Sequence, residues 1–494
     1  MIAIGFFMLP YMLHSLGEDT YGLWILVSSI IAAFYVFDLG FANTITVFLS
    51  KSFSKKDAVA VNQTISTAFL IYCTLACVIF LASVIVALSV PYWAEKKELV
   101  RLMQILILIT GGSLALEFPF KAFAGVAVAF YRFDLVSYSR LTFRLIGAGI
   151  TILLIEKGFG LIGIAWGYFF VAGVSNFVFY WIARSVYGEM RVSISLVSRG
   201  VVKELLNFSL WTFVIDTAQI LKGKIDIFIV GIFMSTTTLA TYYVAVRLAE
   251  SAIQFATHAT SLSLPVFSKY QAQNNVQQLK RGVILFSRVN AMVGSLMLIG
   301  LGLLGLSFIK LWIGPEHDSA LSYQCMITLL IGRFLFYQAA PSAAYLYVSG
   351  GHRYLAIVGI IEAVFAIALT YFLVRHTALG LFGAAIGMGA GNFLSRATVL
   401  MWVACQKIDY SITRLYRHLA PIAIFAIVLV SGSLMLPESV RSPETYIELV
   451  AYSLILGAAF VGGILFLLSN DERNIVAGVL PEKIAKLLWV RHNK

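Results

Sequence analysis

Five polar side chains follow one face of an otherwise apolar segment, residues 240–266. Their spacings of three or four residues place them on one stripe of an α-helix: Arg247, Glu250, Gln254, His258 and Ser261. The apolar segment before it, residues 205–233, contributes Asp216, Lys222, Lys224 and Asp226. Side chains of these types bind anions or take up a proton or sodium ion, and inside an apolar segment they require water or a polar partner opposite them.

Further ionisable residues interrupt other apolar segments, where a charge costs roughly 3 kcal/mol or more. Asp38 lies in the stretch FYVFDLGFANTI, with apolar runs on both sides. The other deep positions are Lys121, Arg333, Glu117 and Glu362. Three more cations lie near the ends of their segments, where long side chains reach the membrane surface: Arg144, Arg288 and Arg396.

Two interpretations of this set remain open. Glu117 and Lys121 are spaced to neutralise each other along one helix, as are Lys222 with Asp226 and Arg247 with Glu250. Alternatively the set lines a water-filled cavity, and several cations in a cavity suit an anionic ligand. The candidate substrate-binding residues are Lys222, Lys224, Arg247, Arg333, Lys121, Gln254 and His258. The candidates for ion coupling or gating are Asp38, Asp216, Asp226, Glu250 and Glu362.

The composition identifies the elements that position these residues. Of 494 residues, 60% are apolar and 12% are charged, and the mean hydropathy is +0.89. Soluble domains are about 45–50% apolar and about 25% charged, so an all-α polytopic membrane protein is predicted. Apolar runs near twenty residues predict about fourteen transmembrane helices. They cover residues 1–13, 21–50, 64–91, 102–131, 139–155, 160–183, 205–233, 240–266, 283–309, 320–349, 354–374, 379–405, 419–436 and 446–468.

The charges of the connections predict the topology. With residues 51–57 on the inside, the inner segments carry 21 lysines and arginines and the outer segments carry 7. This bias places both termini in the cytoplasm, and it accounts for the net charge of +12 without a nucleic-acid partner. The first span is short, and its flanks are not those of a signal peptide, so we expect a first helix that begins late.

An internal repeat predicts two lobes. GLIGIAWG at 160–167 matches GLFGAAIG at 380–387 at five of eight positions, with an offset of 220 residues, and three weaker matches have a similar offset. Six helices separate each pair, which predicts a parallel repeat of two six-helix lobes, as in transporters. The predicted parts are an N-lobe at 1–190, a cytoplasmic linker at 191–204, a C-lobe at 205–405, two added helices at 406–468 and a basic cytoplasmic tail at 469–494.

Motifs of enzymes and of metal sites are absent from the sequence. It holds no HExxH and no GxSxG, and GKI at 223–225 lacks the spacing of a phosphate loop. The four cysteines, Cys73, Cys77, Cys325 and Cys405, lie in apolar segments, where small apolar packing is the expected role. The chain is therefore expected to be no enzyme and to hold no metal or organic cofactor. Uphill transport would then depend on a proton or sodium gradient.

Short motifs in a fixed order resemble one transporter family. Leu16-Gly17, Tyr21-Gly22 and Asp38-Leu39-Gly40 are similar to the opening of the polysaccharide transporter family, in the multidrug/oligosaccharidyl-lipid/polysaccharide flippase superfamily. The second half agrees at Asp226, Gly231, Tyr243, Arg247 and Leu311-Trp312-Ile313-Gly314.

The resemblance implies a flippase of the bacterial cytoplasmic membrane. Its substrate would be an undecaprenyl-pyrophosphate-linked oligosaccharide repeat unit, used for O-antigen, capsule or exopolysaccharide and carried to the outer leaflet by alternating access. Its partners would be this lipid-linked oligosaccharide, the lipid bilayer, and a glycan polymerase with its chain-length machinery. The resemblance also implies an acidic residue where Asp38 stands. Asp38 then either pairs with a cation or takes up a coupling ion, or it bonds backbone freed by Gly40 in a locally opened helix.

Three other functions are weighed against this one. A multidrug antiporter of the same superfamily favours a more acidic or aromatic cavity and commonly twelve helices. A lipid II flippase of the superfamily fits the composition equally well. A membrane glycan polymerase, from another class, needs a large outer loop with catalytic residues, and the outer connections of this sequence are short.

Overall fold

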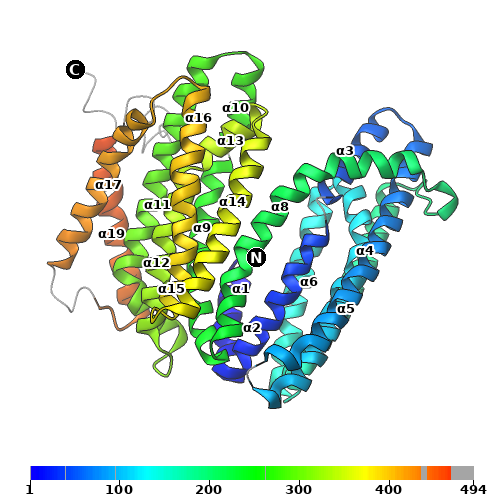
Figure 1. Ribbon diagram of the computed structural model, residues 1–494, viewed down its shortest axis with the longest axis horizontal. Coiled ribbons are helices and arrows are strands. Elements are labelled where there is room, and N and C mark those ends of the chain that lie inside the picture. The colour runs from blue at the N-terminus through cyan, green and yellow to red at the C-terminus, as the bar shows by residue number, and fades with distance from the viewer. Residues whose placement is uncertain (1, 39–40, 95, 262, 436–441, 469–494) are drawn as a thin grey trace. The chain divides into compact units, whose positions relative to one another are not determined.

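The computed structural model describes residues 2–38, 41–94, 96–261, 263–435 and 442–468, and all regular elements within these ranges are helices (Figure 1). In the first half these are α1 (Ile2–Leu16), α2 (Glu18–Ala33), η1 (Phe34–Asp38), α3 (Phe41–Ser54), α4 (Ala58–Trp93), η2 (Lys97–Leu99), α5 (Val100–Ala129), α6 (Phe133–Glu156), α7 (Gly160–Val186), η3 (Ile194–Leu196) and α8 (Arg199–Phe233). In the second half they are α9 (Thr236–Ser261), α10 (Ser263–Ala272), α11 (Val276–Ile313), α12 (Ser319–Gln338), α13 (Ala340–Val348), α14 (His352–His376), α15 (Leu381–Asn392), η4 (Phe393–Leu400), α16 (Met401–Lys407), α17 (Ile412–Leu434) and α19 (Tyr446–Leu467).

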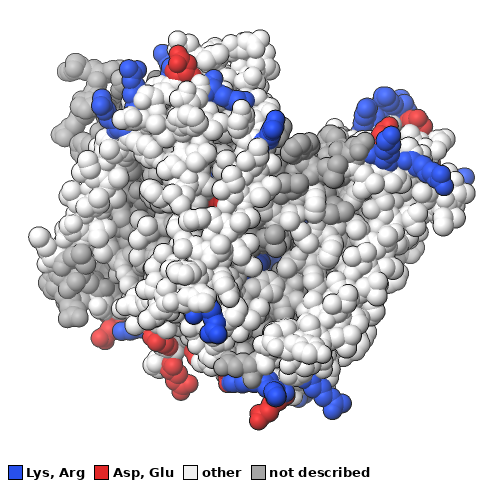
Figure 2. Space-filling view, viewed as in Figure 1, with Lys and Arg blue, Asp and Glu red and all other residues white. Residues whose placement is uncertain are grey.

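Each of the fourteen predicted spans coincides with a helix or with an interrupted helix. Within the described residues, nine helical segments are long and apolar enough to cross a membrane, and they contain α2, α4, α5, α6, α7, α11, α14, α17 and α19. The other five predicted spans fall on α1, α8, α9–α10, α12–α13 and α15–η4–α16, which are shorter, interrupted or more polar. On the visible face of each unit described below, charged side chains gather at the two ends and leave the flank nearly free of them (Figure 2). The prediction of an all-helical, multi-pass membrane protein is confirmed.

Two compact units divide the chain. Unit 1 comprises Met1–Val244 and Gly359–Met388, and unit 2 comprises Ala245–Val358 and Gly389–Lys494. The boundary lies inside α9 rather than at the predicted linker, because α8 packs against α2, α3 and α4 of unit 1. The predicted division into two repeated lobes stays a prediction.

A hydrogen-bonded strap fastens the segment after α7 to α4 within unit 1. The Asn62 side chain donates to the Glu189 carbonyl (3.2 Å) and accepts from the Arg191 amide (2.8 Å). One turn further along α4, the Ser66 hydroxyl donates to the Arg191 carbonyl (3.3 Å) and accepts from the amide of residue 193 (3.2 Å). The Thr67 hydroxyl accepts from the amide of residue 198 (3.2 Å). We call residues 189–198 the strap, and α8 begins directly after it.

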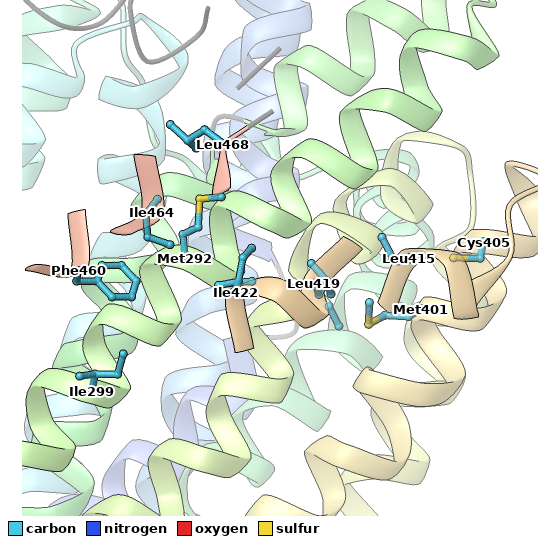
Figure 3. Close-up of a cluster of buried hydrophobic side chains, with 12 residues drawn as sticks. Met292, Ile299, Met401, Cys405, Leu415, Leu419, Ile422, Phe460, Ile464 and Leu468 are labelled. Carbon is cyan, nitrogen blue, oxygen red and sulfur yellow. The ribbon is translucent and has the colours of Figure 1, made fainter. Parts of the chain in front are cut away.

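Unit 2 is organised around α11, whose 38 residues contact α12, α17 and α19. A cluster of buried side chains joins these helices, with Met292 and Ile299 from α11 meeting Ile422 from α17 and Phe460 from α19 (Figure 3). Arg288 of α11 is 9% exposed and donates to the carbonyls of His418 (2.7 Å) and Leu467 (2.6 Å). This arginine therefore bonds to the backbone of both C-terminal helices rather than reaching for the membrane surface.

Candidate substrate and coupling sites

Asp38 ends the 3₁₀ helix η1, at a break between the regular helices α2 and α3. Its Oδ1 accepts a hydrogen bond from the Tyr72 hydroxyl of α4 (2.9 Å) and lies 3.7 Å from the Lys121 Nζ of α5. The side chains of Asp38 and Lys121 are 22% and 17% exposed, so the pair is partly shielded from solvent. Asp38 therefore pairs with a cation, at a place where the helix is locally altered, and its role in ion coupling stays a prediction.

Lys121 is also held by two aromatic rings. Its Nζ lies 4.1 Å from the ring centroid of Phe118 and 4.7 Å from that of Tyr35. A cation over an aromatic face is stabilised by the ring quadrupole, and more strongly where water is excluded. The ion pair of Lys121 is with Asp38 on another helix and not with Glu117 on its own helix, although Glu117 has the spacing for it.

Glu117 faces the same group of residues. Its two carboxylate oxygens accept from the Tyr35 hydroxyl at 3.3 and 3.2 Å. Together these residues form the α5 charge cluster, defined as Tyr35, Asp38, Tyr72, Glu117 and Lys121. The cluster holds two acids and one lysine inside the membrane-spanning part of unit 1, an arrangement that can bind an ion or exchange partners when the helices move.

Asp226 is a deeply buried acid on α8. It is 1% exposed, and its Oδ2 accepts from the Tyr242 hydroxyl of α9 (2.9 Å) while Oδ1 accepts from the Ile227 amide (2.9 Å). Glu362 of α14, also in unit 1, is likewise 1% exposed. Lys224, two residues before Asp226, is half-buried. Burial at this level requires partners, because an isolated ion inside a protein is strongly destabilised.

The remaining predicted residues lie in unit 2 or outside the described side chains. Arg247, Glu250 and Gln254 lie on α9, which is helical as the polar stripe predicted, and the first two are half-buried. Arg333 is half-buried on α12. The side chains outside the described part of the structure belong to Asp216, Lys222 and His258. The roles of all these residues stay predictions.

A second polar group joins α2, α9 and the connection between α4 and η2 at one end of unit 1. The Asp19 carboxylate of α2 accepts from the hydroxyls of Thr236 (2.6 Å) and Thr237 (2.8 Å) at the start of α9, and from the Lys96 ammonium (2.8 Å). Next to it, Gly22 lies so close to α9 that a Cβ there would be 1.9 Å from the Thr236 carbonyl oxygen. We call these five residues the α2–α9 junction. The charge bias of the sequence predicts that this end of unit 1 faces the outside of the cell.

Sequence reasoning missed Tyr35, Tyr72 and the whole α2–α9 junction. The hydroxyls of both tyrosines bond to carboxylates far away in the sequence, Tyr35 to Glu117 and Tyr72 to Asp38, so no helical spacing predicts these contacts. Asp19 and Lys96 lie in or beside short connections, where a charged residue is usual and carries no signal of its own. A sequence signal for the junction exists in TYG at 20–22, where a glycine lies within the first turn of an apolar span.

Comparisons with known proteins identify the family. A family described as polysaccharide biosynthesis protein matches residues 16–322, which is more than half of the chain. No curated protein matches the sequence.

Solved structures share the fold. The inward-facing form of a multidrug resistance MATE family transporter of the MOP superfamily has a TM-score of 0.69 at 16% identity, covering 84% of this chain and 94% of that chain. The lipid II flippase MurJ, in an inward closed conformation, has a TM-score of 0.68 at 14% identity, covering 94% and 97%. A MOP superfamily transporter from Pyrococcus furiosus has a TM-score of 0.59 at 15% identity, covering 83% and 92%. The chain therefore belongs to the polysaccharide biosynthesis protein family and has the fold of the MOP superfamily transporters.

Proposed function

We propose that this protein is a flippase that moves undecaprenyl-pyrophosphate-linked oligosaccharide repeat units to the outer leaflet of the bacterial cytoplasmic membrane. The observation that carries the proposal is the combination of the polysaccharide biosynthesis family with a transporter fold. Polysaccharide repeat units are assembled on a lipid diphosphate, and a transporter in that process has this lipid as its natural cargo. O-antigen, capsule or exopolysaccharide is the expected product.

The charged residues inside the membrane suit such a cargo. Lys121, held by Asp38 and two aromatic rings, and the predicted cations Lys222, Lys224, Arg247 and Arg333 would attract the diphosphate and acidic sugars. The sugars would cross in water between the lobes while the polyprenyl chain stays in lipid. Asp38, Asp216, Asp226, Glu250 or Glu362 would take up the coupling proton or sodium ion.

The α2–α9 junction would act as the outer gate. Its hydrogen bonds and the close approach at Gly22 hold α2 against α9 at the end that we place outside. Alternating access requires this contact to separate before cargo leaves. Both chain termini would lie in the cytoplasm, and the glycan polymerase with its chain-length machinery would receive the cargo on the other side.

A deletion strain tests the proposal. Lipid extracts should accumulate a complete single repeat unit on undecaprenyl diphosphate at the cytoplasmic leaflet, and surface polysaccharide should be lost. Complementation with the intact gene is the control. Accumulation at the outer leaflet would indicate a polymerase instead. Accumulated lipid II would indicate a lipid II flippase, and altered drug sensitivity with normal lipid intermediates would indicate a multidrug antiporter.

A further inference from the structure

Two arginines on α6 are exposed inside a membrane-spanning helix. Arg140 and Arg144 are four residues apart, so they lie on the same face of α6, about 5–6 Å apart at their Cβ atoms. Both are exposed, and within the described chain neither has an ion pair or a side-chain hydrogen bond. Long arginine side chains at this end of a span reach the headgroup region, where an anionic group can bind them.

The depth of the pair can be worked out from the helix. Counted back from Glu156 at the outer end, a hydrocarbon core of about 30 Å takes up about 20 residues and ends near residue 137. Tyr138, which is 70% exposed, stands at this level, as interfacial tyrosines do. Arg140 and Arg144 therefore lie roughly 5 and 10 Å inside the inner edge of the core. Their side chains lean toward the helix N-terminus, which is toward the inner headgroups.

The neighbouring element makes this place suitable for an anion. Helix α6 packs against α5, and the electrostatic attraction of Arg140 for the Glu117 carboxylate extends across this contact. Lys121 of the α5 charge cluster already has Asp38 as its counter-ion. Counting Arg140, Arg144 and Lys121 against Asp38 and Glu117, the group has one more cation than anions. An added anion would balance it.

We infer that Arg140 and Arg144 form a diphosphate-binding site that receives the head of the lipid-linked substrate at the inner leaflet. The guanidinium group is planar and binds phosphate oxygens in pairs, so two of them one helical turn apart can each hold one phosphate of a diphosphate. The depth matches a lipid headgroup that has begun to move inward. This inference rests on the proposed function, since it assigns a place to that cargo.

Binding of a short lipid diphosphate tests the site directly. The full chain is placed in nanodiscs of phosphatidylcholine and titrated with farnesyl diphosphate, with farnesol as the uncharged control. Each charge-assisted contact contributes about a factor of ten or more, so R140Q/R144Q should bind roughly 100-fold more weakly than the wild type. Arg132→Gln removes an exposed arginine, bonded to Asp134, from the same end of α6 and should change nothing.

A substitution that should strengthen binding of farnesyl diphosphate separates this role from a structural one. Glu117→Gln removes a carboxylate that competes for Arg140, so farnesyl diphosphate should bind several-fold more tightly. A fold defect would weaken binding in both variants, whereas the site requires opposite changes.

The outcomes distinguish the site from the proposed function. If the wild type binds farnesyl diphosphate and R140Q/R144Q binds it equally well, the site is wrong and the function stands. If the wild type binds farnesyl diphosphate no better than farnesol, the proposed function fails as well. If phosphatidylglycerol added to the nanodiscs displaces farnesyl diphosphate at equal affinity, the arginines hold ordinary anionic lipid and the inference is overturned.

Discussion

Replacement of Gly22 by alanine should open the α2–α9 junction. The added Cβ would lie 1.9 Å from the Thr236 carbonyl oxygen, which is 1.5 Å short of the 3.4 Å at which ordinary contacts begin. Because the obstacle is backbone, α2 must move away from α9. A movement of that size lengthens the 2.6 Å hydrogen bond between Asp19 and Thr236 to about 4 Å, beyond hydrogen-bonding range.

The same geometry gives the free energy by which Gly22→Ala destabilises the closed junction. Overpacking of this kind costs about 1–3 kcal/mol, which raises the ratio of open to closed junctions by roughly 5- to 150-fold. Met103 reports on that ratio, because it is 4% exposed and lines a small pocket beside Lys96 and Thr236. In a chain whose four native cysteines are replaced, Met103→Cys should react with a membrane-impermeant maleimide faster by this factor when Gly22 is alanine.

Gly149→Ala is the matched control. It also adds one methyl group to a helix of unit 1, but no atom lies within 4 Å of the new Cβ. Maleimide should therefore react at the wild-type rate. Equal rates for the Gly22 and Gly149 variants would refute the junction as a closed gate.

Three further substitutions test other parts of the structure. Lys121→Gln leaves Asp38 without its cation and should reduce transport about tenfold, while the neutral double variant with Asp38→Asn should recover part of the loss. Asn62→Ala removes two hydrogen bonds of the strap, at about 1–3 kcal/mol, and should speed tryptic cleavage at Arg191 at least fivefold. Arg288→Gln removes two charge-assisted bonds, at about 3 kcal/mol or more, and should lower the thermal stability of the purified protein.

Each of these expectations has a distinct contrary result. Transport that falls further in the double variant than in Lys121→Gln would mean that Asp38 acts independently of the lysine. Unchanged cleavage at Arg191 would mean that the strap is held by other contacts. Arg353→Gln removes an exposed arginine and serves as the control for Arg288, so equal melting temperatures of the two would contradict the role of Arg288.

The helices could be predicted from the sequence because bilayer thickness fixes their length. In the described residues, each predicted apolar span coincides with a helix or an interrupted helix, and the polar stripe through Arg247 lies on the regular helix α9. A locally opened helix near Gly40 was one of the possibilities for Asp38, but the 3₁₀ form of residues 34–38 was not predicted, because no periodicity in FYVFD distinguishes it from an α-helix. The predicted span 21–50 matches the region that α2, η1 and α3 occupy, but it is not one continuous α-helix.

The partners of the charged residues were largely beyond sequence reasoning. Helical spacing predicts a pair of Glu117 with Lys121, because residues four positions apart are neighbours on one helix. Contacts between different helices cannot be predicted in this way. The structure pairs Lys121 with Asp38, 83 positions away, through the packing of α5 against η1 and α4. Tertiary contacts of this kind depend on how helices pack, and no periodicity in the sequence encodes them.

The strap also constrains the order of events during synthesis. The ribosome adds Asn62 to the chain 127 residues before its hydrogen-bond partner Glu189. At about 5–20 residues per second, the Asn62 amide waits roughly 6–25 s for that bond. During this interval Asn62, Ser66 and Thr67 must be hydrated, because no backbone is yet present to satisfy them. Their position in the first turns of α4, at the expected cytoplasmic surface, keeps them within reach of water until residues 189–198 are synthesised. By then helices α1 to α7 have been synthesised as well.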